Sequence, residues 1–363
     1  MKSKWETKTL GEVCKKGSSN VSLNKIQDNE GEYPIYGAKG FLKKVDFYHQ
    51  DKPYISIIKD GAGVGRVNLQ EAKSSVIGTL QYIIPKDDID INFLYYFLLG
   101  IDFEKYSCGA AIPHIYFKDY EKEEIKVPSL EEQEQIVKIL DEVFESISKS
   151  KENAEKNLKN AKELFESYLE EIFSNPKEGW EEKKLGEVCN LSAGGDVPKD
   201  NFSKNITEKY KVPIFSNGIN GKELYGYTDI EKVTEPSITI SARGTIGYPE
   251  IRRKPFYPII RLIVVIPESK ILNLDFLKYA LSRINFTKSG TSIPQLTVPM
   301  IREYDIVFPK SLAGQTAIVQ KLDSLSSQVK QLEEIYKQKL KDLEELKKSM
   351  LQKAFSGELT KKS

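Results

Sequence analysis

The chain has 363 residues, of which 39% are apolar, 29% charged and 10% aromatic. At roughly 100–200 residues per domain this length predicts two or three domains, and the composition excludes a largely disordered chain and a collagen-like one. The net charge of +1 does not indicate a protein whose whole surface is basic, so any basic surface must be local.

The cysteines and the apolar runs indicate the compartment. Cys14, Cys108 and Cys189 have no metal-ligand spacing, and their odd number argues against a disulfide framework. The longest apolar stretch, residues 259–266, contains Arg261 and is far shorter than the ~20 residues of a membrane span. The basic start lacks the apolar segment of a signal peptide. We therefore expect a cytoplasmic protein that does not associate with membranes.

The most informative feature is an internal duplication. The segment WETKTLGEVC at residues 5–14 recurs 175 residues later as WEEKKLGEVC at residues 180–189. The patterns QxxIVxxLD (residues 133–141 and 315–323) and SxLxxxFS (residues 167–174 and 349–356) each occur twice, both at an offset of 182. One unit is therefore about 180 residues long, a globular part followed by a long helical part.

Each globular part is predicted to mix strands and short helices. Runs rich in β-branched residues and bounded by Pro and Gly indicate strands, and short apolar runs rich in Leu, Tyr and Phe indicate buried helices. Strands are predicted at residues 52–58, 76–84, 236–240 and 259–266, and helices at residues 92–99 and 274–281.

The sequence Gly61-Ala62-Gly63-Val64-Gly65 resembles a dinucleotide-binding loop only superficially. No helix follows it, because residues 66–69 predict another strand, and the second copy, residues 243–247, loses the pattern. A tight turn with positive φ explains both copies.

Catalytic motifs are absent from the sequence. There is no GxxxxGK[ST] phosphate loop, no Asn/Asp-Pro-Pro-Tyr motif of adenine methyltransferases and no convincing cluster for a metal-dependent nuclease. The only histidines, His49 and His114, lie in the first copy, so no histidine-based acid–base site is repeated. We expect a binding or scaffold protein that is not an enzyme and holds neither a metal nor a cofactor.

Two long helices are the strongest local prediction. Residues 129–174 and 315–356 contain neither Pro nor Gly, and Ser129 followed by Glu132 has the spacing of a capping box. Residues 129–175 hold six basic and twelve acidic residues, so this segment is acidic. About forty-five residues at 1.5 Å each give a rod of roughly 60–70 Å, too long to be buried against one small domain.

A heptad seam runs along both predicted helices. In the first helix it comprises Leu140, Val143, Ile147, Ser150, Ala154, Asn157, Ala161, Leu164 and Tyr168, and in the second Leu322, Leu325, Val329, Leu332, Tyr336, Lys339, Leu343, Leu346 and Met350. The first seam is small in its middle and the second is bulky, which predicts that the helices pair, with Asn157 and Lys339 as polar positions that fix the register. The alternative is that each helix packs only on its own globular domain.

These features together resemble the specificity (S) subunit of type I restriction–modification systems. The resemblance rests on the duplicated start at residues 5–14 and 180–189, on VPSLEEQ at residues 127–133 and on LQKAFSGEL at residues 351–359. It also rests on a repeated Gly-x-x-Ile-Pro motif, which follows Cys108 in the first copy and Ser289 in the second, at residues 109–113 and 290–294. It covers essentially the whole chain.

The resemblance implies an α+β fold with two mixed α/β target recognition domains, residues 1–128 and 176–310. The helical regions, residues 129–175 and 311–363, would form an antiparallel coiled coil. Each domain would read one half of a bipartite, asymmetric site in double-stranded DNA, with the coiled coil setting the unread spacer. Two modification subunits would dock on the helices, and restriction subunits would be recruited. These partners, not this chain, would use S-adenosylmethionine, ATP and Mg²⁺.

Candidate DNA-binding residues follow from charge. Six of the seven arginines lie between residues 243 and 302, and Arg pairs bidentately with guanine. The candidates in the second domain are Arg243, Tyr248, Arg252, Arg253, Lys254 and Arg261, and those in the first are Lys39, Lys43, Lys44, Lys59, Arg66 and Lys73. Each could instead be an ordinary solvated charge. His114 and Gln295 occupy matching places after Ile-Pro, where a turn-stabilising role is favoured over base reading.

Two other functions remain open at this point. One is a coiled-coil scaffold whose globular ends bind proteins. The other is the specificity subunit of a related system in which one partner chain both methylates and cleaves. The sequence does not determine the DNA target or the spacer length.

Overall fold

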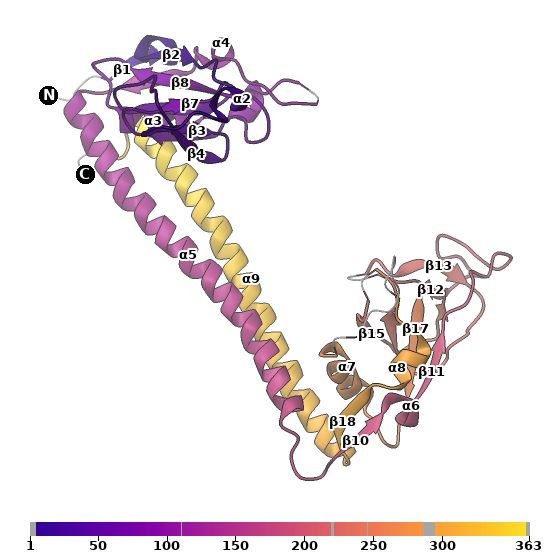
Figure 1. The fold of residues 1–363 in the computed structure, drawn as a ribbon. Helices are drawn as coiled ribbons and strands as arrows, with labels where there is room; N and C mark the ends of the chain where they lie inside the picture. Colours follow the sequence, from indigo (N-terminus) through magenta and orange to yellow (C-terminus); the bar gives the residue numbers. More distant parts are fainter. Residues whose placement is uncertain are drawn as a thin grey trace. The chain divides into compact units, whose positions relative to one another are not determined.

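The computed structural model describes residues 5–109, 111–218, 221–244, 246–284, 286 and 295–360. It contains two compact units, one comprising Met1–Glu155 with Lys337–Ser363 and the other Lys156–Tyr336. Each unit holds one globular domain together with part of both long helices (Figure 1). The two units are described in turn.

The first domain is built on a four-stranded antiparallel sheet. Its order is β2 (Cys14–Ser18), β8 (Leu80–Pro85), β5 (Tyr54–Ile58) and β6 (Val67–Gln70). A second sheet has the order β4 (Gly40–Val45), β3 (Tyr33–Gly37) and β7 (Ser75–Val76), and β1 (Glu6–Thr9) pairs with β9 (Glu124–Val127). The helices are α1 (Leu10–Val13), α2 (Leu23–Ile26), α3 (Ile91–Gly100), the 3-10 helix η1 (Phe103–Tyr106) and α4 (Phe117–Tyr120).

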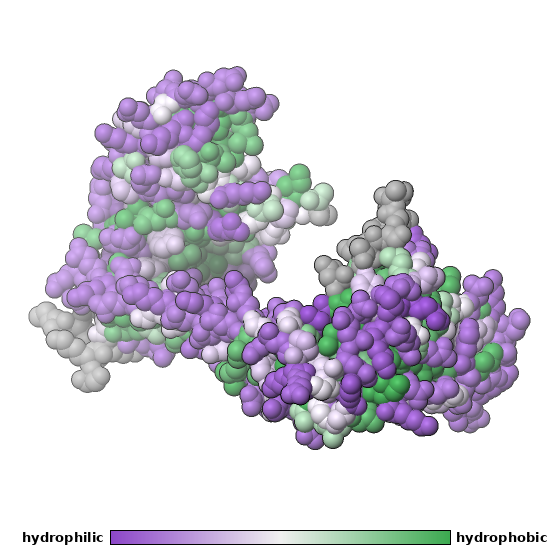
Figure 2. Space-filling view, turned by 60° about the horizontal axis from the view of Figure 1, so that its bottom comes forward, coloured by the Kyte–Doolittle hydropathy of each residue, from purple (hydrophilic) through white to green (hydrophobic). Residues whose placement is uncertain are grey.

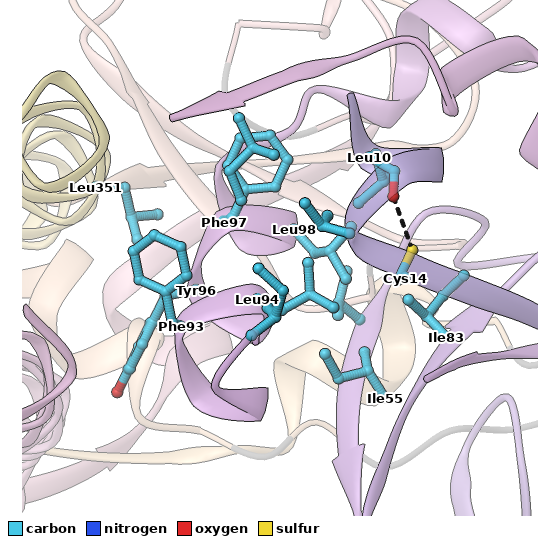
Figure 3. Packing of buried hydrophobic residues seen from close by; sticks show 14 of the residues in the cluster. Leu10, Cys14, Ile55, Ile83, Phe93, Leu94, Tyr96, Phe97, Leu98 and Leu351 are labelled. Atoms are coloured by element: carbon cyan, nitrogen blue, oxygen red, sulfur yellow. Dashed lines mark hydrogen bonds between the residues drawn. The ribbon is translucent and has the colours of Figure 1, made fainter. Parts of the chain in front are cut away.

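Strand β5 is buried on both faces, which explains its uninterrupted apolar sequence. Side chains alternate along a strand, so Ile55 and Ile57 join the core that includes α3, whereas Tyr54 and Ile58 join a second core against β3 and β7. Figure 3 shows the first core, in which Leu94 and Leu98 of α3 lie toward Ile55 and Ile83, and Phe93 lies on the side of Leu351. The same core includes Leu351 of the last helix.

The second domain repeats this plan. Its four-stranded sheet has the order β11 (Cys189–Ala193), β17 (Leu262–Pro267), β14 (Ser237–Ser241) and β15 (Pro249–Arg252). The other strands form β13 (Leu224–Thr228), β12 (Val212–Phe215) and β16 (Tyr257–Pro258), and a pair of β10 (Trp180–Lys184) with β18 (Asp305–Pro309). The helices are α6 (Leu185–Val188), α7 (Leu274–Ser282) and α8 (Val298–Arg302). The predicted duplication is confirmed, because equivalent strands pair in the same order.

Two predicted strands differ from the observed ones near their starts. The run at residues 76–84 is split into β7 and β8, because Ile77, Gly78 and Thr79 turn between them. The run at residues 259–266 begins only at Leu262. Apolar character alone did not distinguish a buried turn from a strand.

The long helices are α5 (Leu130–Ser174) and α9 (Leu312–Ser356), and they pack antiparallel (Figure 1). In the first unit the Lys151 ammonium of α5 lies 2.8 Å from the Glu344 carboxylate of α9, and the Lys347 ammonium lies 5.2 Å from the centre of the Phe144 ring. In the second unit Phe173 of α5 shares a core with residues of α9. The predicted pairing is therefore confirmed, and the alternative, with each helix packed only on its own domain, is wrong.

The seam differs from the predicted heptads after its first turns. Leu140, Ile147, Ala154, Ala161, Leu322 and Val329 are buried, and Val143, Leu325, Tyr336 and Leu343 are half-buried. Leu164 is 57% exposed, Leu346 46% and Leu332 38%, so these three predicted seam positions are wrong. Asn157 and Lys339 are exposed and cannot fix the register, which corrects that prediction too.

The cause of the shift is the period of the α-helix. A helix repeats every 3.6 residues, so a strict seven-residue pattern drifts by about 20° in each heptad. After Ala154 the half-buried Leu158 and Phe165 each lie one residue beyond the predicted Asn157 and Leu164.

Each domain is joined to the start of a long helix by one buried glutamine. Gln133 is fully buried, and its Nε2 donates to the carbonyl oxygens of Asp88 and Pro128, both at 3.1 Å. Its Oε1 accepts a 2.8 Å hydrogen bond from the amide of Asp90, the residue that caps α3. The hydrogen-bonding groups of the buried Gln133 side chain are therefore paired with backbone groups of the domain.

The second unit contains the same joint. Gln315 is fully buried and donates to the carbonyls of Ile271 and Pro309 at 2.8 Å, and it accepts from the amide of Asn273 at 2.7 Å. Asn273 caps α7 as Asp90 caps α3. A further bond follows eight residues, about two turns, later in each long helix, between Tyr96 and Asp141 and between Tyr279 and Asp323.

No helix in the described part of the chain is long and apolar enough to cross a bilayer. Hydrophilic residues cover most of the face shown in Figure 2, with smaller hydrophobic areas between them.

The joint predicts a large difference between two neighbouring glutamines. Gln133→Ala leaves buried peptide groups without a partner, which should lower the free energy of unfolding by about 1–3 kcal/mol. Gln135→Ala, at an exposed position on the same helix, should cost less than about 0.5 kcal/mol. Urea unfolding followed by circular dichroism measures both, and equal effects would contradict the assigned role of Gln133.

Candidate nucleic-acid interface

Three loops of the first domain meet at one end of its four-stranded sheet. They are the β3–β4 turn (residues 38–39), the β5–β6 turn (residues 59–66) and the segment that comprises residues 108–109 and 111–115. The amide of Gly61 donates to the carbonyl of Pro113, and the amide of Ile115 donates to the carbonyl of Lys59, both at 2.9 Å. The Arg66 guanidinium donates to the carbonyl of Ala38 at 3.3 Å. We call this group of loops the loop end of the domain.

Glycines give the β5–β6 turn its shape. Gly61, Gly63 and Gly65 have φ values of 87°, 91° and 83°, which confirms the predicted turn with positive φ. A Cβ on Gly65 would lie 2.5 Å from the Cβ of Phe103, so this glycine also permits close packing. The turn leads directly into β6 and not into a helix, unlike a dinucleotide-binding loop.

An ionic cluster lies within the first loop end. The His114 Nδ1 lies 2.8 Å from an oxygen of the Asp60 carboxylate, and Lys59 also pairs with Asp60. Partial burial would raise the pKa of the Asp60 carboxyl, but the hydrogen bonds from Lys59 and His114 outweigh it and hold that pKa below its usual range. His114 therefore contributes to the turn, as the sequence favoured.

The second domain has an equivalent loop end. The amide of Leu296 donates to the carbonyl of Ala242 at 2.8 Å, which is the counterpart of the bond between Ile115 and Lys59. The Asn217 amide of the β12–β13 loop donates to the carbonyl of Arg243 at 3.2 Å. Gly247 matches Gly65, since its φ is 86° and a Cβ there would lie 2.8 Å from the ring of Phe286.

The predicted basic residues of the first domain are divided by the fold. Lys39, Lys59 and Arg66 lie at the loop end. Lys43 and Lys44 lie along β4, where the ammonium of Lys43 donates to the carbonyl of Gln27 at 3.0 Å. Lys73 lies beyond the other end of β6, so the structure does not bring it to the same surface.

The predicted residues of the second domain are divided in the same way. Arg243 and Tyr248 lie at the loop end, and so does Arg261, whose carbonyl accepts from the amide of Ala242 at 2.9 Å. Arg252, Arg253 and Lys254 do not, because β15 runs away from this end, and Arg252 pairs with Ser237 at the far end of β14. The six candidates therefore do not share one surface.

Two of those arginines are engaged within the domain itself. Arg252 lies 3.8 Å from the centre of the Phe215 ring and donates to the Thr239 hydroxyl at 3.2 Å, and burial lowers its pKa. Arg253 pairs with Asp275 of α7 at 2.5 Å. Both side chains hold the domain together, which makes them poor candidates for reading bases.

A basic cavity, which the sequence did not predict and which we call the lysine cavity, lies beside the first loop end. Its volume is about 570 Å³, and its lining includes Lys16 of β2, Lys59 and Lys118 of α4 together with Tyr116. Among the described residues, neither Lys16 nor Lys118 has an ion-pair partner. By the duplication Lys16 corresponds to Leu191 and Lys118 to Pro299, so the lysine cavity belongs to the first domain alone.

The loop ends suit binding better than covalent chemistry. Among the described residues, no group of three or more His, Cys, Asp or Glu side chains could hold a metal ion. Cys14 and Cys189 are buried, which raises the pKa of each thiol to about 12, and Cys108 is exposed. The motif at residues 290–294 and Ser289 lie outside the described residues.

Comparison with known proteins places the chain. The family described as the type I restriction modification DNA specificity domain matches residues 2–159 and 177–344, once for each copy. The chain is 31% identical over 321 residues to a Mycoplasma pneumoniae chain named type I specificity subunit S.MpnORF507P, covering 84% of each. It is 24% identical to the specificity subunit of the type I restriction enzyme MjaIX of Methanocaldococcus jannaschii, covering 84% of this chain and 77% of the relative.

Solved structures show the same fold. A chain from a structural study of complex assembly and conformational transition in a type I restriction–modification system matches with a TM-score of 0.76 at 18% identity, covering 99% of this chain and 100% of that one. The HsdS subunit of Thermoanaerobacter tengcongensis matches with a TM-score of 0.60, also at 18% identity, covering 98% and 97%. With its two family matches, its two recognition-type domains and its antiparallel helix pair, the chain belongs to the DNA specificity subunits of type I restriction–modification systems, which are themselves non-catalytic.

Proposed function

We propose that residues 1–128 and 176–310 each read one half of a bipartite, asymmetric site in double-stranded DNA. The observation that carries this proposal is the repeated loop end. In each domain the turn after an inner strand of the four-stranded sheet meets a loop of the neighbouring sheet and a residue at an isolated bridge, His114 or Gln295, yet the side chains differ. Two domains with the same loop backbone but different side chains are suited to bind two different DNA sequences.

The helical regions, residues 129–175 and 311–363, would set the unread spacer. Each domain is fixed to the start of one long helix by a buried glutamine and packs against the end of the other helix, at Leu351 in the first unit and Phe173 in the second. A domain held at both contacts cannot turn freely on the helices. The spacing between half-sites then depends on helix length, as a ruler requires.

The outer faces of the helices would dock two modification subunits. Leu164, Leu332, Ile335 and Leu346 leave apolar surface exposed there, with Ile335 59% exposed. Restriction subunits would join the same complex. The partner subunits, not this chain, would bind S-adenosylmethionine, ATP and Mg²⁺. Because the substrate is DNA, we expect the complex to be cytoplasmic.

Base reading would depend mainly on donors at the loop ends. Arg66 in the first domain and Arg243 and Arg261 in the second can pair with guanine, and Lys39 and Lys59 can contact phosphates. Phosphate contacts supply affinity and base contacts supply sequence preference.

The direct test is the methylated motif. The chain, expressed with its modification subunits in a host that lacks other methyltransferases, should direct adenine methylation to one motif made of two defined blocks separated by a fixed unread gap. A single contiguous motif would contradict the two-reader proposal. A chain that binds no DNA but captures other proteins would indicate the scaffold function, and one partner that both methylates and cleaves would indicate the related system.

The lysine cavity predicts a change in salt dependence. If Lys16 and Lys118 contact phosphates, Lys16→Ala/Lys118→Ala should reduce the slope of log K against log salt by about 2, since each phosphate contact contributes about 0.9. Lys52→Ala/Lys73→Ala removes the same charge from the opposite end of the sheet and should leave the slope nearly unchanged. Equal slopes for both variants would exclude the cavity from the interface.

The thiols provide a footprint of the interface. At pH 8 only Cys108 of the folded chain should react with iodoacetamide, because burial holds the pKa of Cys14 and Cys189 near 12 and leaves almost no thiolate. Cognate DNA should slow the reaction of Cys108 severalfold, since this residue lies at the first loop end. Cys108→Ser is the control and should leave no reactive thiol before unfolding. Unchanged labelling with DNA bound would place the interface elsewhere.

A further inference from the structure

The two loop ends hold one pair of side chains at equivalent backbone positions. Asp60 faces His114 across an isolated β-bridge, and Arg243 faces Gln295 across the corresponding bridge. In both domains the residue after the bridge donates its amide to the carbonyl just before the turn, Ile115 to Lys59 and Leu296 to Ala242. The backbones therefore place residues 60 and 243, and residues 114 and 295, in the same roles.

The chemistry at these positions differs between the copies. The first domain has a carboxylate bound to an imidazole at 2.8 Å. The second has a guanidinium and an amide, and among the described residues the guanidinium of Arg243 has no hydrogen-bond or ion-pair partner. Gln295 is exposed, and Arg243 and His114 are partly exposed. In the first loop end the Asp60 carboxylate already accepts a hydrogen bond from His114. In the second, the Arg243 guanidinium offers donors that no described residue uses.

Donors and acceptors select different base edges. The fork of an arginine matches the O6 and N7 acceptors of guanine, and a glutamine amide matches the N6 and N7 of adenine. With Nδ1–H donated to Asp60, neutral His114 presents Nε2 as an acceptor, a tautomer that we assign from the hydrogen bond. Such an acceptor can bind the amino group of adenine or cytosine and has no partner on the major-groove edge of guanine.

We propose that the residue pairs Asp60–His114 and Arg243–Gln295 determine how the two half-sites differ. Arg243 specifies a guanine in the half-site of the second domain, and Gln295 reads an adjacent adenine. His114 selects a base with a major-groove amino group in the half-site of the first domain, and Asp60 is the positioning residue that fixes its tautomer. This inference rests on the proposed function.

The test compares base preferences position by position. The chain, assembled with its modification subunits, is bound to a DNA library in which each position of both half-sites is varied. Arg243→Gln should abolish the preference for guanine at one position of one half-site, a loss of at least tenfold in selectivity, and leave the other half-site unchanged. Arg243→Lys keeps the charge but loses the fork, so it should lose most of that selectivity while retaining more affinity. Lys254→Gln removes one charge at the far end of β15 and should change no preference.

The first domain is tested in the same library. His114→Gln should change the preferred base at one position of the half-site that Arg243→Gln leaves unchanged. Asp60→Ala frees the imidazole and should weaken the preference at that same position, a readout that a purely structural role would not move. Circular dichroism checks that each variant is folded. If Arg243→Gln or Asp60→Ala does not fold, the conservative variants Arg243→Lys and His114→Gln still test the proposal.

The outcomes separate this inference from the proposed function. If the wild-type complex reads two blocks but all four variants keep every base preference, the assignment of these residues is wrong and the proposed function stands. If the wild-type complex has no sequence preference, the proposed function itself fails. Changes in both half-sites from one variant would also overturn the inference, because each pair lies in one domain only.

Discussion

A buried side-chain amide at the root of each long helix is the constraint on which the rest depends. Gln133 and Gln315 are fully buried, and each satisfies three backbone groups of the neighbouring domain. An amide withdrawn from water must keep all its partners, because each unsatisfied group costs free energy. The helix therefore leaves the domain in one direction only. The same joint occurs in both units, so each domain is held to the first turns of one long helix.

The two duplicated domains share one backbone arrangement but differ in their exposed side chains. Backbone hydrogen bonds, turn glycines and strand order are shared by both domains, whereas the exposed side chains at their loop ends differ in charge and in donor character. Since the loops are held by backbone groups, their side chains can vary without changing the fold. The two copies within this chain keep one scaffold while their exposed side chains differ.

The sequence predicted features that depend on local pattern. The duplication, the two long helices and the turn around Gly63 follow from repeats, from the absence of Pro and Gly and from glycine spacing, and the structure confirms them. The exact seam was partly wrong, since the helix period of 3.6 moves the buried face away from Leu164 and Leu346. Arginine density grouped residues of the second domain that the structure places at opposite ends of its four-stranded sheet.

The sequence by itself determined the repeated unit, the helix lengths and the family, because each is written in residues close together or at a constant offset. Only the tertiary structure decided which charged residues share a surface. Strand β15 carries Arg252 and Arg253 away from Arg243, and the pairing of β2 with β8 helps to bring Lys16 near Lys59. Proximity between distant residues depends on strand pairing and packing across the whole domain, and no short stretch of sequence contains that information.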